Sequence, residues 1–179
     1  MTQFKAISPS AEVNGEAVYA ILDGVGTMKQ SALEMLRKYG IVDPQPGKWY
    51  PQQAWLDAFK EITEKIGPNT VFQIATKIPD NAKFPPQIDS IEKALAAIDV
   101  AYHMNHRGGD IGSYKSTSTG ARAAKVVCAN PMPCAFDRGL ITSMAKRFKP
   151  AGAAATVKHD DSQPCRSNGQ TTCTYLVSW

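Results

Sequence analysis

The segment from Asp89 to Met104 constrains the fold more than any other part of the sequence. At helical spacing, four apolar or aromatic side chains share one face of this segment, namely Ile91, Leu95, Ile98 and Tyr102. Alanines and valine cover most of the remaining surface, and Asp89 with Glu92 are placed like a capping box that starts a helix at Ser90. Because a helix that is apolar nearly all round belongs in the protein interior, we predict that it is the central helix.

The sequence pattern differs on the two sides of this segment. Residues 1–109 are typical of helices separated by turns, and four helices are expected before the central one: one after Ser8 that ends near Gly24, then Met28–Tyr39, one from Pro51 to about Gly67, and Asn69–Ile78.

Residues 110–179 instead predict strands, in the order two strands, one helix, two strands. The expected strands are Ser113–Ser118, Ala121–Ala129, Ala154–Lys158 and Thr172–Trp179, and Asn130-Pro131 is expected to cap the helix between the pairs. We therefore predict one α+β domain over 1–179. An N-terminal helical layer (1–109) packs on an antiparallel sheet of about four strands with one long helix between the strand pairs (110–179).

Composition excludes several classes of function. The chain has 179 residues, a formal net charge of +4 and scattered basic residues, so a nucleic-acid partner is not expected. The polar N-terminus has no secretory apolar region, and no stretch is long enough to span a bilayer, so we expect a cytoplasmic protein. In that compartment the four cysteines favour thiols or metal ligands over disulfides.

Three of these cysteines form a candidate metal site. Cys165 and Cys173 lie on either side of an Asn-Gly turn, and strands flanking that turn would bring both sulfurs to one ion. Cys134 lies at the start of the predicted helix, where the helix dipole favours the thiolate that zinc needs. A fourth tetrahedral ligand can come from His159, Asp160, Asp161 or Cys128, and the alternative is a group of buried apolar cysteines.

The segment Asn130–Leu140, followed by His159, Cys165 and Cys173, resembles the C-terminal half of a 4-vinyl reductase domain. That bacterial sensory family is similar in fold to haem-NO-binding domains and to TRAPP subunits. The resemblance implies a zinc site on Cys134, Cys165 and Cys173. Ser162 stands where the family has an acidic ligand, and His159 is the candidate in its place.

Two histidines form a candidate cofactor site at the end of the central helix. His103 and His106 are three residues apart, so both can address one site, and the chain order resembles the haem-NO-binding layout, which implies an axial haem ligand. The haem-clamping Tyr-x-Ser-x-Arg signature of that family is absent, because Tyr114-Lys115-Ser116 is not followed by arginine. The alternative is a pair of polar residues at a helix end.

We expect a binding module rather than an enzyme, since no nucleotide fingerprint or nucleophile–base arrangement is present. A pocket between helices and sheet would hold a small hydrophobic, aromatic or tetrapyrrole ligand. Its expected lining is Tyr102, Trp55, Phe59, Phe72 and Phe136, although each of these also suits a core. The alternatives are a haem- or tetrapyrrole-binding sensor and a TRAPP-like interaction module. The chain would act as a homodimer or through a separate output protein.

Overall fold

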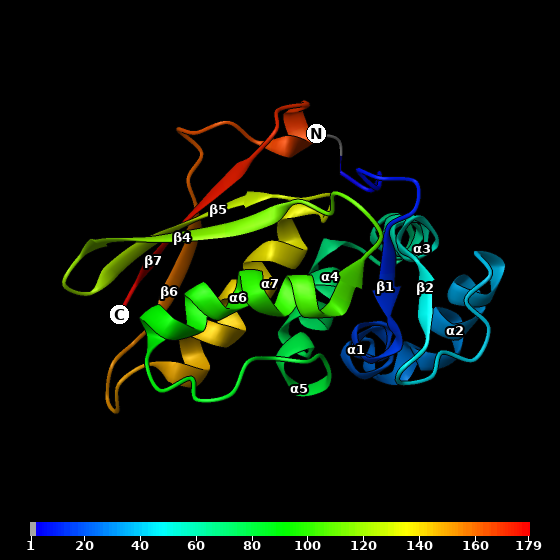
Figure 1. The fold of residues 1–179 in the computed structure, drawn as a ribbon, viewed down its shortest axis with the longest axis horizontal. Coiled ribbons are helices and arrows are strands. Elements are labelled where there is room, and N and C mark those ends of the chain that lie inside the picture. The colour runs from blue at the N-terminus through cyan, green and yellow to red at the C-terminus, as the bar shows by residue number, and fades with distance from the viewer. Residues whose placement is uncertain (1–2) are drawn as a thin grey trace.

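The computed structural model describes residues 3–179, and these form two layers (Figure 1). The helices are α1 (Gly15–Gly24), α2 (Lys29–Lys38), α3 (Gln52–Lys65), α4 (Pro68–Thr76), α5 (Ile78–Asn81), α6 (Ile91–Asn105) and α7 (Cys134–Phe148). The strands are β1 (Glu12–Asn14), β2 (Trp49–Pro51), β3 (His106–Arg107), β4 (Ser113–Gly120), β5 (Ala123–Ala129), β6 (Thr156–His159) and β7 (Cys173–Ser178), with short 3-10 turns at Gly26–Met28 and Arg166–Asn168.

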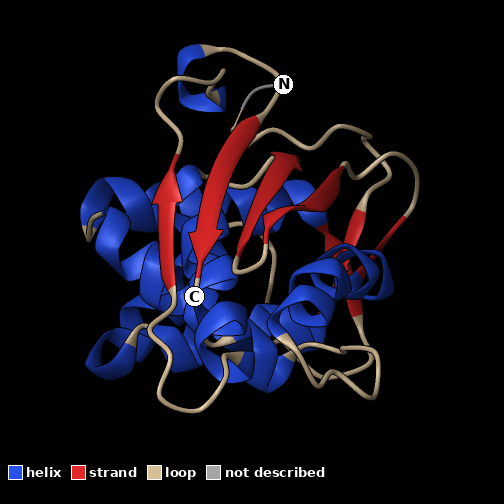
Figure 2. Cartoon of the chain, turned by 90° about the vertical axis from the view of Figure 1, so that its left-hand side faces the viewer, coloured by secondary structure: helices blue, strands red, loops and turns tan. Residues whose placement is uncertain are grey.

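The larger sheet is antiparallel with strand order β4-β5-β7-β6, and helices cover one of its faces (Figure 2). The α+β prediction, with a helical layer on a C-terminal sheet of four strands, is confirmed. Along β5 the inward side chains are buried and the outward Lys125 is exposed, which is the alternation of a sheet with one solvated face.

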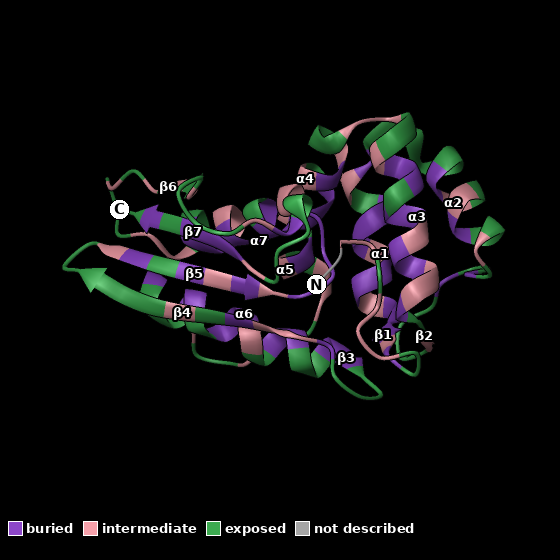
Figure 3. Cartoon of the chain, turned by 90° about the horizontal axis from the view of Figure 1, so that it is seen from above, coloured by how far each residue is buried: buried purple, intermediate pink, exposed green. Residues whose placement is uncertain are grey.

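The central helix is α6. Ser90 caps it by accepting a hydrogen bond from the Lys93 amide, and Ile91, Leu95 and Ile98 are buried as predicted. One side of α6 nevertheless reaches the surface, since Val100 is 50% and Met104 39% exposed. Buried stripes on α1 and α3 face the same core (Figure 3).

Three details differ from the sequence predictions. A second, three-stranded sheet (β2-β1-β3) joins segments from three parts of the chain, because Val13 pairs with both Tyr50 and His106. The first helix begins at Gly15 and not directly after Ser8, since Asn14 supplies its cap by accepting from the Ala17 amide. Helix α7 begins after Pro133, which makes no side-chain cap, while Asn130 accepts a hydrogen bond from the Met132 amide.

Candidate metal centre and ligand cavity

Four metal-binding side chains meet at one end of the sheet. They are Cys134 at the start of α7, His159 at the end of β6, Cys165 before the 3-10 turn and Cys173 at the start of β7, and their ligand atoms all lie within 4.8 Å of one another. The sulfur of Cys134 is 3.6 Å from that of Cys165 and 3.5 Å from that of Cys173, and the latter two are 3.7 Å apart.

These separations match a tetrahedral zinc site. Zn–S bonds of about 2.3 Å at tetrahedral angles separate two sulfurs by about 3.8 Å. The Nε2 atom of His159 is buried and has no hydrogen-bond partner among the described residues, while its Nδ1 lies 2.7 Å from a carboxylate oxygen of Asp161. A histidine held by a carboxylate on one nitrogen, with the other nitrogen free, is the usual arrangement of a zinc ligand. The donor set therefore fits Zn²⁺.

The other candidates for the fourth ligand lie outside this set. Asp161 holds the histidine ring, and Asp160 accepts hydrogen bonds from the amide and hydroxyl of Ser162. Cys128 faces Cys173 across the β5–β7 ladder and is fully buried, and it is not one of the four clustered residues.

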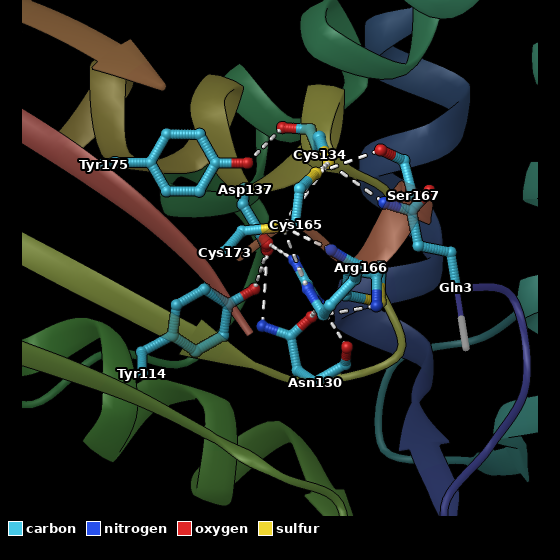
Figure 4. A network of polar contacts seen from close by, with 11 residues as sticks. Gln3, Tyr114, Asn130, Cys134, Asp137, Cys165, Arg166, Ser167, Cys173 and Tyr175 are labelled. Atoms are coloured by element: carbon cyan, nitrogen blue, oxygen red, sulfur yellow. Dashed lines mark hydrogen bonds and ion pairs between the residues drawn. The ribbon is translucent and has the colours of Figure 1, made fainter. Parts of the chain in front are cut away.

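Each sulfur has a hydrogen-bond partner from outside the cluster (Figure 4). Gln3 Nε2 donates to Cys134 at 2.9 Å, and the Ser167 hydroxyl lies 3.0 Å from Cys165. The backbone N–H and the Nε–H of Arg166 both donate to Cys173 at 3.3 Å. Donors of this kind favour thiolates, the form that binds metal. A hydrogen bond from Cys134 is the largest cause that lowers the pKa of Cys173, and the same contact is the largest cause that raises the pKa of Cys134, so without metal the shared proton stays on Cys134.

The sheet register brings the cluster together. His159 is the β6 partner of Tyr175 on β7, and the Tyr175 hydroxyl donates to the Cys134 carbonyl at 2.9 Å, which fixes the start of α7 against the sheet. The turn between Cys165 and Cys173 differs from the prediction. Cys165 is not in a strand, and a 3-10 turn that ends at Gly169 in a left-handed conformation (φ 79°) positions it instead.

A second feature is a small cavity between the helices and the sheet. Its volume is about 30 Å³, and its walls are mostly apolar and aromatic, including Trp55, Phe84, Ile98, Tyr102, Tyr114 and Phe136. A water molecule needs a cavity volume of about 10–15 Å³, so this cavity has room for about two water molecules.

Two residues that line this cavity each have a buried polar atom without a partner among the described residues. His106 Nδ1 is 3.0 Å from the Tyr102 carbonyl, and as the donor it leaves a free lone pair on Nε2, which has no partner within the described chain. Trp55 Nε1 also has none, and its ring lies 5.6 Å from that of His106. Burial lowers the pKa of His106 to about 4, so the imidazole is neutral. The residues that line the cavity thus include one unpartnered donor, on Trp55, and one unpartnered acceptor, on His106.

The structure separates the two candidate cofactor histidines. His106 lines the cavity, whereas His103 is about half exposed and bonds to the Asp99 carbonyl on the outer side of α6. Among the expected pocket residues, Trp55, Tyr102 and Phe136 line the cavity. Phe59 packs behind them at 4.8 Å from Trp55 and 5.4 Å from Phe136, and Phe72 lies apart, under the Arg138 guanidinium.

The sequence analysis missed the buried polar network beside the metal cluster, made of Tyr114, Asn130, Asp137 and Arg166. Arg166 and Asp137 form an ion pair in which neither side chain is exposed. An arginine in a polar loop gives no sequence signal of burial. The one available clue was its place between two candidate ligands.

Comparison with known proteins gives a fold but no family. No family model matches the sequence, and no curated protein is similar to it. Among solved structures, an H-NOX protein from S. oneidensis in the Fe(II) ligation state is similar over 92% of this chain and 95% of its own, with a TM-score of 0.66 and 15% identity.

H-NOX structures from K. algicida (TM-score 0.62, 12% identity, 92% of this chain and 95% of that one) and T. tengcongensis (TM-score 0.63, 12% identity, 90% and 94%) are similar as well. The predicted likeness in fold to haem-NO-binding domains is therefore confirmed, and membership of the 4-vinyl reductase family stays a prediction. In the part of the chain that the structure describes, no helix is long and apolar enough to cross a membrane.

Proposed function

We propose that this protein is a small-molecule-binding sensory module whose C-terminal half is held by a structural zinc ion. The proposed zinc site rests on one observation. The ligand atoms of Cys134, His159, Cys165 and Cys173 lie close together, and the three cysteine sulfurs have the spacing of a tetrahedral site. Four protein ligands leave no open coordination position, which is typical of a structural site rather than a catalytic one. When bound, zinc joins β6, β7, α7 and the 160–172 loop into one unit.

The ligand site is the cavity at Trp55 and His106. A hydroxyl group both donates and accepts, so it would satisfy the free Nε2 of His106 and the indole N–H of Trp55 together, while the aromatic walls hold an apolar body. Pockets for small ligands usually have about 300–1,000 Å³. The cavity must therefore widen on binding, and a difference in packing between empty and occupied forms is what a sensor needs.

The first test is elemental analysis with an absorption spectrum on the full chain, purified without a histidine tag. We expect one zinc per chain and no band near 400 nm. Phenol is the first ligand to titrate. Its binding is monitored by the fluorescence emission of Trp55 in a protein that also carries Trp49→Phe and Trp179→Phe. The variant His106→Phe should weaken phenol binding, whereas the matched variant His103→Asn should not. Purified protein without zinc would contradict the proposed metal site. Equal phenol binding by the two variants would contradict the proposed ligand site.

A haem-based gas sensor is the second candidate. The likeness to H-NOX structures over more than 90% of the chain favours it, as does the free Nε2 of buried His106, which suits an axial ligand. The residues around His106 do not fit a porphyrin as they are packed. The cavity of about 30 Å³ is more than tenfold smaller than typical ligand pockets, and no arginine or lysine is among its lining residues to bind propionates.

Haem binding therefore requires the core around Trp55 and Phe136 to open. Reconstitution with haemin decides between the candidates. A Soret band that His106→Ala abolishes and His103→Ala keeps would establish the haem reading. The homodimer or separate output protein expected from the sequence remains part of the proposal, and sedimentation of the metal-loaded chain tests the dimer.

A further inference from the structure

A continuous set of polar contacts joins the metal centre to the cavity (Figure 4). It starts at Arg166, which lies in the sequence between the proposed metal ligands Cys165 and Cys173. The side chain of Arg166 is completely buried. Its Nε donates to Cys173, one terminal nitrogen donates to the backbone and side-chain oxygens of Asn130, and the other donates to Asp137. A buried guanidinium is tolerated only when its donors are satisfied in this way.

Asp137 connects Arg166 to a residue of the cavity wall. It lies three residues after Cys134 on α7 and is fully buried. One carboxylate oxygen accepts from Arg166, and the other accepts from the Tyr114 hydroxyl at 2.7 Å and from the Asn130 amide at 3.3 Å. Tyr114 in turn lines the cavity, with its ring edge-on to that of Tyr102 at 5.2 Å. Asp137 thus binds both Arg166, beside the metal centre, and Tyr114, in the cavity wall.

The anchoring of the segment around Arg166 shows why this set depends on the metal. Residues 161–164 and 167–171 are largely exposed, and the cluster ties Cys165, the neighbour of Arg166, to Cys134 and Cys173. Without the metal that tie is weakened, and the segment is held by the contacts of Arg166 with Cys173, Asn130 and Asp137.

We propose that Arg166 and Asp137 couple the metal centre to the ligand cavity by positioning Tyr114. With metal bound, Arg166 neutralises Asp137, and Asp137 holds the Tyr114 hydroxyl in the cavity wall. When the metal leaves, the loop around Arg166 loses its tie through Cys165, the contact between Arg166 and Asp137 loosens, and Tyr114 is released. Metal binding and cavity occupancy are then linked equilibria, and each must change the affinity of the other by the same factor. This inference rests on the proposed zinc site.

The experiment uses the full chain with Trp49→Phe and Trp179→Phe, so that Trp55 in the cavity wall is the sole indole. Cobalt absorption first establishes metal binding in each variant, and zinc titration then follows Trp55 emission. We expect zinc to shift the emission of the parent protein. Tyr114→Phe should bind the metal and lose at least half of that shift. Tyr102→Phe is the matched control, since it also removes a cavity hydroxyl, one that donates to the Ile111 carbonyl, and it should keep the shift.

A second variant tests the ion pair without leaving a lone buried charge. Arg166→Met combined with Asp137→Asn removes both charges together, so the protein should fold and bind cobalt with a 10- to 100-fold lower affinity, as for other groups around metal ligands. Its Trp55 emission should not respond to zinc. A parent protein that binds no metal would refute the proposed zinc site itself. A parent that binds zinc with unchanged Trp55 emission, or a Tyr114→Phe protein with the full shift, would refute the coupling alone.

Discussion

Removing one metal ligand should make the thermal stability of the protein insensitive to zinc. The variant is Cys165→Ser, because Cys165 is partly exposed and its replacement disturbs little packing. A ligand that binds only the folded state stabilises it by about 4 kcal/mol when its free concentration is 1,000 times the dissociation constant. For a domain of this size, 1 kcal/mol shifts Tm by about 2–4 °C, so zinc buffered at that level should raise Tm by about 8–16 °C over chelated protein.

Differential scanning fluorimetry at buffered zinc measures this shift. The wild-type chain should show it, and Cys165→Ser should melt at one temperature with or without zinc. Cys128→Ala is the matched control, because Cys128 is a buried cysteine outside the cluster, and the shift should survive there even if the baseline Tm falls. A wild-type Tm that does not change on chelation, or an equal shift in Cys165→Ser, would refute the assignment of the site.

Two further predictions concern the core. Burial lowers the pKa of His106 to about 4, whereas a histidine in the unfolded chain titrates near 6.5. Between these pH values the unfolded chain binds a proton on His106 that the folded protein does not bind. The free energy of unfolding therefore falls by up to about 3 kcal/mol as the pH drops from 6.5 to 4. In a Cys165→Ser background, which removes the pH dependence of zinc binding, urea unfolding should show this loss in His103→Asn but a much smaller one in His106→Phe. A Cβ on Gly139 would lie 2.8 Å from that of Ala75 on α4, so Gly139→Ala should destabilise the protein by about 1–3 kcal/mol, and Gly120→Ala, which meets nothing closer than 3.8 Å, should not.

The ligand cluster could be predicted because its residue types are rare and chemically specific. Three cysteines around one helix and one turn have few roles in the reducing compartment that we expected, and His159 was the nearby imidazole. The small sheet could not be predicted, since β1, β2 and β3 are two or three residues long and pair residues that are 35 to 95 positions apart. No local alternation exists in strands so short.

The cavity and the buried ion pair escaped prediction for a different reason. Trp55, Tyr102 and Phe136 serve a core and a pocket equally well, and only three-dimensional packing distinguishes the two. Arg166 is buried because Asp137 and Asn130, 29 and 36 residues earlier in the chain, bind its guanidinium. Sequence patterns describe the preferences of single segments, and these features arise where segments meet.

The start of α7 provides a last prediction, because the proposed zinc ion would act there as a helix cap. Pro133 makes no side-chain cap, whereas α6 is capped by Ser90, so the first turn of α7 depends on Cys134 and its partners. An anionic zinc–thiolate centre at this end is favoured by the helix dipole. Hydrogen–deuterium exchange should therefore accelerate at least tenfold in peptides covering 134–139 when zinc is chelated, and stay unchanged at the start of α6. Since Phe136 in that turn lines the cavity, equal exchange with and without zinc would mean that the metal stabilises only the loop and not the cavity wall.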